Sequence, residues 1–92
     1  AIATNLNPGS APCPSMAMVV AQATRKLGLS VDAALDAAAR ALAELLGLPD
    51  RGRLEVGARA DLVLLDTPDA RDAAFLGGWN PVIGVWIGGQ RV

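Results

Sequence analysis

The feature that most constrains the fold of this chain is a change of hydrophobic period at residues 50–52. Before it, apolar residues recur every three or four positions, as on a helix face, and after it they alternate or run together, as in strands. Ser15 and Ser30 are typical N-caps, which predicts helices over residues 16–27 and 31–46. Gly47 and Pro49 end the second helix. Helices followed by strands predict an α+β arrangement.

Short strands are predicted at both ends of the chain. Residues 1–4 are small, apolar and partly β-branched, as at the end of a buried strand, and a loop rich in turn-forming residues follows them. Beyond residue 52, the pattern predicts three or four short strands, at residues 53–56, 61–66 and 82–87 and from residue 90. The irregular stretch 67–78 has room for one helical turn, and Gly88-Gly89 predicts a hairpin turn.

Length and composition exclude several classes of function. The 92 residues allow one domain at most. Eight Lys and Arg against nine Asp and Glu give no electrostatic basis for nucleic-acid binding. One Cys and no His exclude a disulfide framework and a Cys-rich zinc site, and they remove the commonest general base. Asp61 and Asp66 flank a predicted strand, so we interpret them as turn caps rather than an acid–base pair.

The apolar content bears on partners and location. The chain is 52% hydrophobic, which is high for so small a domain. We therefore expect exposed apolar faces, covered by a missing upstream portion or by self-association. The two longest uncharged stretches are interrupted by Pro, Gly and Asn, which argues against a membrane span. No secretory signal is visible, and we expect a cytoplasmic protein.

Four segments carry a family resemblance. Residues 52–66, GRLEVGARADLVLLD, resemble the G-x-L-x-x-G-x-x-A-D-L-V segment near the C-terminus of amidohydrolase-superfamily enzymes. Residues 3–10, ATNLNPGS, resemble the A-T-D-x-N-P-G-[ST] segment of imidazolonepropionases, ring-opening hydrolases of histidine degradation. Residues 78–82 and 88–92 are similar to their G-x-N-P-V and G-G-x-x-V patterns. The resemblance spans nearly all of the chain but only the last part of such an enzyme.

The resemblance implies an α/β parent fold. In that family a (β/α)₈ barrel holds a zinc or iron ion, and a small β-sandwich is assembled from both chain ends. Residues 1–50 would be the end of the barrel, from strand eight through two helices, and residues 51–92 the C-terminal part of the sandwich. The metal-binding histidines of the family lie upstream. We therefore expect no cofactor in this chain alone.

The resemblance also assigns candidate site residues. The family's strand-eight Asp, a metal ligand and proton acceptor, falls on Asn5, the candidate catalytic and metal position. An amide oxygen can coordinate a metal but cannot take a proton from water. Asn7, Gly9 and Ser10 match family positions that bind the substrate. A second departure is Ala41, where the family has an Asn.

The implied reaction is metal-dependent hydrolysis of a cyclic amide. Its small-molecule substrate would be 4-imidazolone-5-propanoate and its product N-formimidoyl-L-glutamate. We expect the isolated chain to be inactive, because it contains one strand of the implied barrel and none of the His ligands. Two alternatives stay open: a non-catalytic α+β module, and a fragment of another amidohydrolase such as a deaminase or deacetylase.

Overall fold

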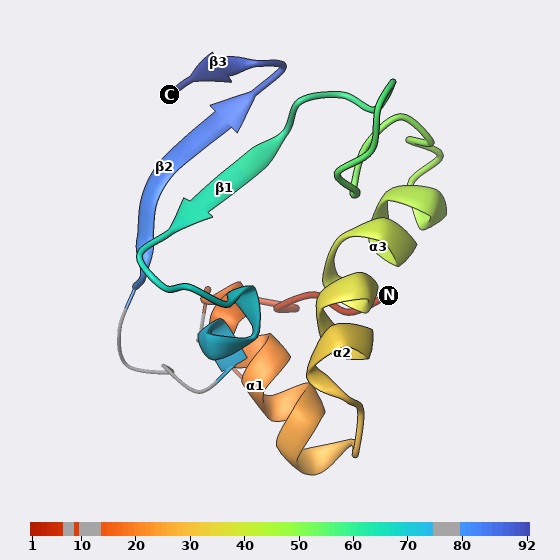
Figure 1. The fold of residues 1–92 in the computed structure, drawn as a ribbon. Coiled ribbons are helices and arrows are strands. Elements are labelled where there is room, and N and C mark those ends of the chain that lie inside the picture. The colour runs from red at the N-terminus through yellow and green to blue at the C-terminus, as the bar shows by residue number, and fades with distance from the viewer. Residues whose placement is uncertain (7–8, 10–13, 75–79) are drawn as a thin grey trace.

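The fold places helices on one side and a small sheet on the other (Figure 1). A computed structural model describes residues 1–6, 9, 14–74 and 80–92. Along the chain the elements are α1 (Met16–Lys26), α2 (Val31–Ala38), α3 (Arg40–Leu45), β1 (Leu62–Leu65), the 3₁₀ helix η1 (Ala70–Ala74), β2 (Val82–Ile87) and β3 (Gln90–Arg91). The predicted α+β order is confirmed. Within the described ranges, none of the helices has the length and apolar character that a membrane crossing requires.

Both predicted N-caps are confirmed. The Ser15 hydroxyl accepts the Met18 N–H at 3.2 Å, and the Ser30 hydroxyl accepts the Ala33 N–H at 3.1 Å. Each bond satisfies one of the free amides at the start of a helix. The two helices pack against each other and against η1. Their buried core consists of Val20, Ala23 and Ala34, with Ile2, Leu29, Val31, Leu35 and Ala38 partly buried around it.

The single second helix of the sequence prediction is wrong, because it breaks at Ala39. This residue has φ −123° and ψ −79°, and its N–H donates to Asp36 O rather than continuing the helical pattern. The backbone of Gly52 lies against the break: a Cβ at Gly52 would be 2.8 Å from Ala39 O. Alanine is the best helix former, so local propensity does not explain the break.

The end of α3 follows the predicted pattern. Gly47 has φ +73°, and its N–H donates to Glu44 O at 3.0 Å. The Leu48 N–H donates to Ala43 O at 2.9 Å. These two bonds form a Schellman motif, in which a left-handed glycine satisfies the last carbonyls of a helix.

The three strands of the described part form an antiparallel sheet in the order β1-β2-β3. The predicted strand at residues 61–66 and the hairpin over residues 82–91 are confirmed. Leu64 pairs with Gly84 but Leu65 pairs with Val82, so Ile83 is an extra residue that bulges from β2. The bulge adds a local bend to the sheet.

Gly84 gives the middle strand room for an aromatic side chain. A Cβ at Gly84 would be 2.7 Å from Cζ3 of Trp86, so the indole ring lies flat on the glycine. The guanidinium carbon of Arg91 lies 5.4 Å from the centre of the ring. This is a cation–π contact. The strand pair β2–β3 is therefore held by side chains as well as by its ladder.

Two predicted strands are absent from the structure. Residues 53–56 form an irregular loop in which Arg53 binds Glu55 and the carbonyl oxygen of Pro49. Residues 1–4 also lack strand structure, because they lie against α2 and not against another strand: the Ile2 N–H donates to Ala37 O at 3.0 Å. A strand requires a partner strand to satisfy its backbone. Neither segment has one in the described part of the chain.

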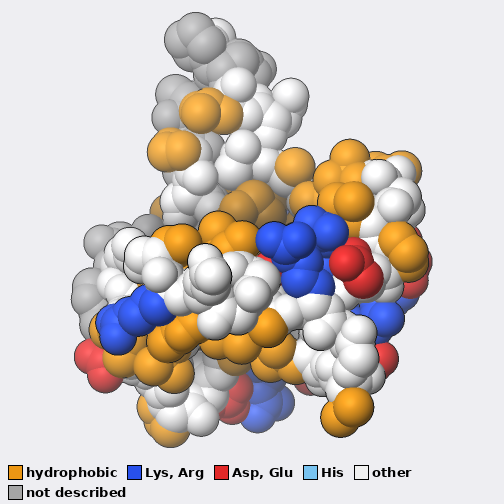
Figure 2. Space-filling model, turned by 90° about the horizontal axis from the view of Figure 1, so that it is seen from above, with side chains coloured by type: hydrophobic (Ala, Val, Ile, Leu, Met, Phe, Trp, Pro, Cys, Tyr) orange, Lys and Arg blue, Asp and Glu red, His pale blue; other side chains and the backbone are white. Residues whose placement is uncertain are grey.

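Both faces of the sheet present large apolar side chains to solvent. Val63 and Ile83 are each 53% exposed. The other exposed apolar residues of β1 and β2 are Leu62, Leu64, Val82 and Ile87. Figure 2 shows apolar side chains reaching the surface between charged ones. A sheet that is apolar on both faces is typical of one covered by a layer on each side.

Candidate functional site

The predicted site loop leaves the helices at a well-defined point. Ile2 packs on the core formed by α1 and α2, and its N–H is bound to α2. Two residues later, the Thr4 hydroxyl accepts the Leu6 N–H at 3.3 Å. This bond closes a short turn around Asn5, so the backbone before and after Asn5 is positioned by local contacts.

Asn5 lies at the tip of this turn with φ +48°. Asn tolerates this left-handed conformation better than most residues, because its short polar side chain can bind the nearby backbone. Asn5 and Gly9 are both exposed. The predicted substrate residues Asn7 and Ser10 lie outside the described residues. The structure therefore places two of the four predicted site residues, both on the surface.

The donor set in the described part of the chain does not fit a zinc or iron ion. Asn5 offers one neutral amide oxygen, whereas such sites use three or more His, Cys or carboxylate ligands. Over residues 1–6, 9, 14–74 and 80–92, no group of three such side chains is placed to hold a metal. The chain also contains no His. We therefore derive no chemical step through a metal from these residues.

Several carboxylates are already paired with arginines. Asp36 lies 2.6 Å from Arg40, and its pKa is lowered mainly by hydrogen bonds from that guanidinium. Asp69 binds both the side chain and the N–H of Arg71, which lowers the pKa of its carboxyl to about 2. These groups stay charged at neutral pH. They are structural ion pairs and not proton donors.

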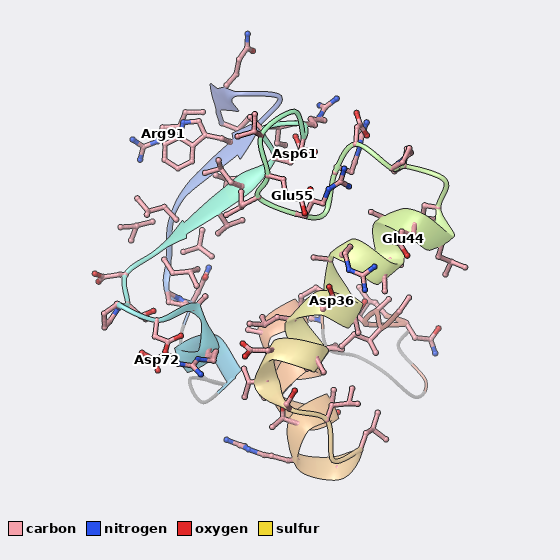
Figure 3. All side chains as sticks on the ribbon, turned by 45° about the vertical axis from the view of Figure 1, so that its right-hand side comes forward. Asp36, Glu44, Glu55, Asp61, Asp72 and Arg91 are labelled. Atoms are coloured by element: carbon pink, nitrogen blue, oxygen red, sulfur yellow. The ribbon has the colours of Figure 1, made fainter. Side chains whose placement is uncertain are left out.

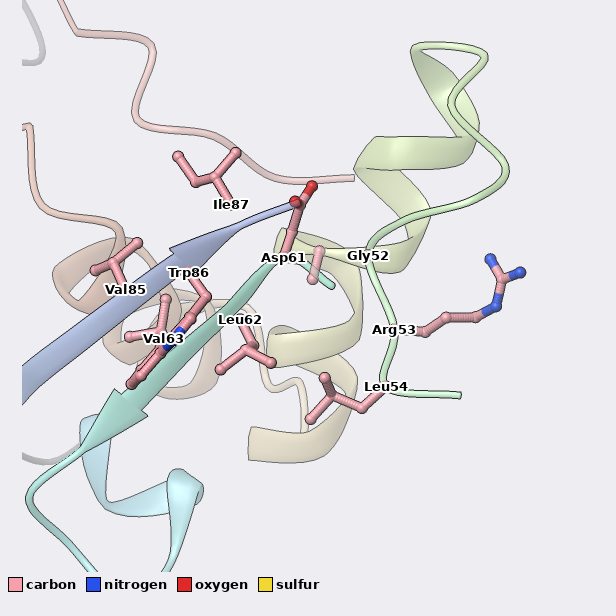
Figure 4. A pocket seen from close by; sticks show the side chains of 10 residues that line it. Gly52, Arg53, Leu54, Asp61, Leu62, Val63, Val85, Trp86 and Ile87 are labelled. Carbon is pink, nitrogen blue, oxygen red and sulfur yellow. The ribbon is translucent and has the colours of Figure 1, made fainter. Parts of the chain in front are cut away.

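An apolar groove lies between the sheet and the break in the helices. It has a volume of about 470 Å³. Its lining includes Gly52, Leu54, Leu62, Val63, Trp86 and Ile87. Figure 4 shows Leu54 and Leu62 on the same side of β1. Two charged residues also line it, but Arg53 is bonded to Glu55 and Asp61 to Arg59. The groove is distant in the chain from Asn5.

Sequence reasoning did not find this groove. The signal was present in the runs 62–65 and 82–87, where apolar residues occupy both odd and even positions. Such runs predict a strand with two apolar faces. Residues 53–56 were predicted to be a strand, whereas in the structure they belong to the loop that forms the other wall of the groove.

The comparisons with known proteins decide the family. Residues 14–92 match the profile of the Amidohydrolase family. The chain belongs to this family. Over all 92 residues, this amidohydrolase chain is 47% identical to an imidazolonepropionase of Deinococcus deserti and 42% identical to one of Streptomyces griseus. It is 50% identical over 80 residues, 85% of the chain, to an imidazolonepropionase of Rubrobacter xylanophilus.

The amidohydrolase chain is much shorter than these relatives. It spans 23%, 24% and 19% of their lengths, respectively. The resemblance drawn from the four sequence segments is confirmed by these matches. The small α+β unit therefore corresponds to less than a quarter of each longer protein.

Proposed function

We propose that this chain is part of a hydrolase that opens the cyclic amide of 4-imidazolone-5-propanoate to give N-formimidoyl-L-glutamate, in histidine degradation. The observation that supports this proposal is the 47% identity, over every residue of the chain, to a protein named imidazolonepropionase. The names of the relatives do not favour the two alternatives, a non-catalytic module and a fragment of a deaminase or deacetylase. We place the enzyme in the cytoplasm.

In this proposal the loop after residue 4 faces the substrate. Asn7 would offer an amide donor and acceptor, Ser10 a hydroxyl, and Gly9 a backbone without a side chain in the way. Asn5 would occupy the position of the family's Asp. The zinc or iron of such an enzyme would take its histidine ligands from outside these 92 residues. The substrate loop is then one wall of a site whose other walls belong to the rest of the enzyme.

We also propose that the rest of the enzyme, including the barrel portion, covers the apolar sheet. Residues 1–50 would close the barrel and residues 51–92 would join the sandwich. The exposed residues of β1 and β2 support this arrangement, as does the share of each relative that lies beyond the chain. Burying such side chains contributes roughly 25 cal/mol per Å² of apolar surface. Self-association through the same faces is the competing outcome.

A chimera tests the proposed function. This chain replaces the matching 92 residues of the Deinococcus deserti imidazolonepropionase, and hydrolysis of 4-imidazolone-5-propanoate is measured with and without Asn5→Asp. We expect the 92-residue chain alone to be inactive. The Asn5→Asp chimera should exceed the unsubstituted chimera by roughly 10²-fold or more, because a carboxylate can accept the proton that an amide cannot.

Asn80→Asp is the matched control for this substitution. Its side-chain oxygen accepts the Val82 N–H at 3.1 Å, and Asp retains that acceptor. The control should leave the rate of hydrolysis unchanged. Equal activity of the chimeras with and without Asn5→Asp would remove this position from the mechanism. A correctly folded chimera without activity toward the imidazolone would reject the proposed substrate.

A further inference from the structure

One carboxylate connects two distant motifs of the chain. The Oδ1 atom of Asp61 accepts the Gly88 N–H at 2.8 Å and the Arg59 Nε–H at 2.8 Å. Beside it, the Gly89 N–H donates to Ala60 O at 2.9 Å. Asp61 lies just before β1, and Gly88-Gly89 is the turn between β2 and β3. In Figure 3, Asp61 lies near the end of the sheet where this turn is formed.

The geometry of the turn explains why a side chain is needed there. Gly88 has φ +59° and Gly89 has φ +83°, so both residues adopt left-handed backbone. A tight hairpin turn of this kind directs some of its amides away from the strand ladder. The Asp61 carboxylate receives one of them. A hydrogen bond to a charged acceptor is roughly twice as strong as one between neutral groups.

We propose that Asp61, through its bonds to Gly88 and Arg59, is a latch that fastens the terminal hairpin to the loop before β1, and that acid releases it. In this proposal, Asp61 of the A-D-L-V segment and the Gly88-Gly89 pair that follows β2 together hold the hairpin in place. The latch is independent of the proposed substrate, because neither motif lies near Asn5 in the chain.

The charges around the carboxylate determine the direction of its titration. Hydrogen bonds from Arg59 and then from the Gly88 N–H lower the pKa of Asp61, and the charge of Arg51 acts in the same direction. A lowered pKa means that the latch is closed above the ordinary Asp range. It opens as the pH falls through the lowered value.

Amide NMR of the 92-residue chain tests the latch. Between pH 7 and 2, the Gly88 amide proton should shift with a midpoint below the ordinary value for Asp. Arg59→Gln should raise that midpoint. Asp61→Asn should abolish the titration and speed hydrogen exchange at Gly88 about tenfold, since a charged acceptor is lost. Asp66→Asn, at the opposite end of β1, is the control and should change neither readout.

Three results would overturn the proposal. The first is a Gly88 resonance that stays constant while the Asp61 carboxyl titrates. The second is unchanged exchange at Gly88 in a folded Asp61→Asn chain. The third is a Gly88 amide with the shift of an unfolded glycine at neutral pH. Where the Asn variant does not fold, the titration of the unmodified chain decides.

Discussion

The helical part and the sheet of this chain differ in how they treat apolar residues. In the helices, Val20 and Ala23 are each 4% exposed and Ala34 is fully buried. In the sheet, much larger side chains remain half exposed, and Leu54 in the adjoining loop is 79% exposed. The helical part also exposes Leu45 of α3, at 73%, but it contains completely buried side chains. Of the apolar side chains of β1 and β2, none is buried.

This difference indicates which part of the chain has the greater need of covering contacts. Alanine-rich helix faces allow close backbone approach and need few neighbours. A two-faced apolar sheet requires cover on both sides. The sheet therefore leaves more of its apolar side-chain surface uncovered than the core between α1 and α2 does.

A substitution at the junction between the helices and the sheet should have the largest effect on the free energy of unfolding. Gly52 has φ +86°, and a Cβ there would meet Ala39 O at 2.8 Å and Arg40 Cα at 2.9 Å. Gly52→Ala should lower the free energy of unfolding by about 3 kcal/mol, from left-handed backbone and overpacking together. Gly57→Ala is the control: it has φ +90° but no heavy atom within 4 Å of the added Cβ. It should cost about 1 kcal/mol, measured by denaturant unfolding.

The same Val→Ala truncation should destabilise the chain more in the helices than in the sheet. Val20→Ala removes two buried methyl groups and should destabilise the chain by about 2 kcal/mol. Val63→Ala removes the same groups from a half-exposed position and should cost about 0.5 kcal/mol in the 92-residue chain. In the chimera, the loss at Val63 should increase. Identical losses for the two variants in the isolated chain would contradict the comparison.

The smallest expected effect is on the stability of the folded chain at low pH. Arg71 lowers the pKa of Asp69, at the start of η1, to about 2. A carboxylate with a lowered pKa stabilises the folded chain above the ordinary Asp value, and this contribution is lost as the pH falls toward 2. Asp69→Asn should therefore flatten the dependence of stability on pH between about 4 and 2. Urea titrations at several pH values would measure this, with Asp66→Asn as the matched control.

Local signals predicted much of the fold. Ser15 and Ser30 cap helices, and Gly47 ends one, because each makes its hydrogen bonds within four residues of itself. The hairpin turn at Gly88-Gly89 was also predicted from its two adjacent glycines, although the amides of these glycines donate to the distant residues Asp61 and Ala60. The break between α2 and α3 at Ala39 was not predictable from local sequence. The residue that lies against it in space, Gly52, is distant in the sequence.

Alternation over a short run was misleading. Leu54 and Val56 alternate with charged residues, yet both are exposed in an irregular loop. A four-residue pattern specifies a strand only where a partner strand is present. For the candidate site, the sequence located Asn5 and Gly9 on one loop through family resemblance. It could not give their surroundings, because the ligands expected around them do not belong to these 92 residues.

Because Ile83 bulges out of the ladder, β2 has one more residue than its pairing with β1 requires. Deleting it would leave all four partners of β1 in place, Trp86, Val85, Gly84 and Val82. A β2 strand shorter by this one residue would therefore keep the same set of side chains on each face of the sheet.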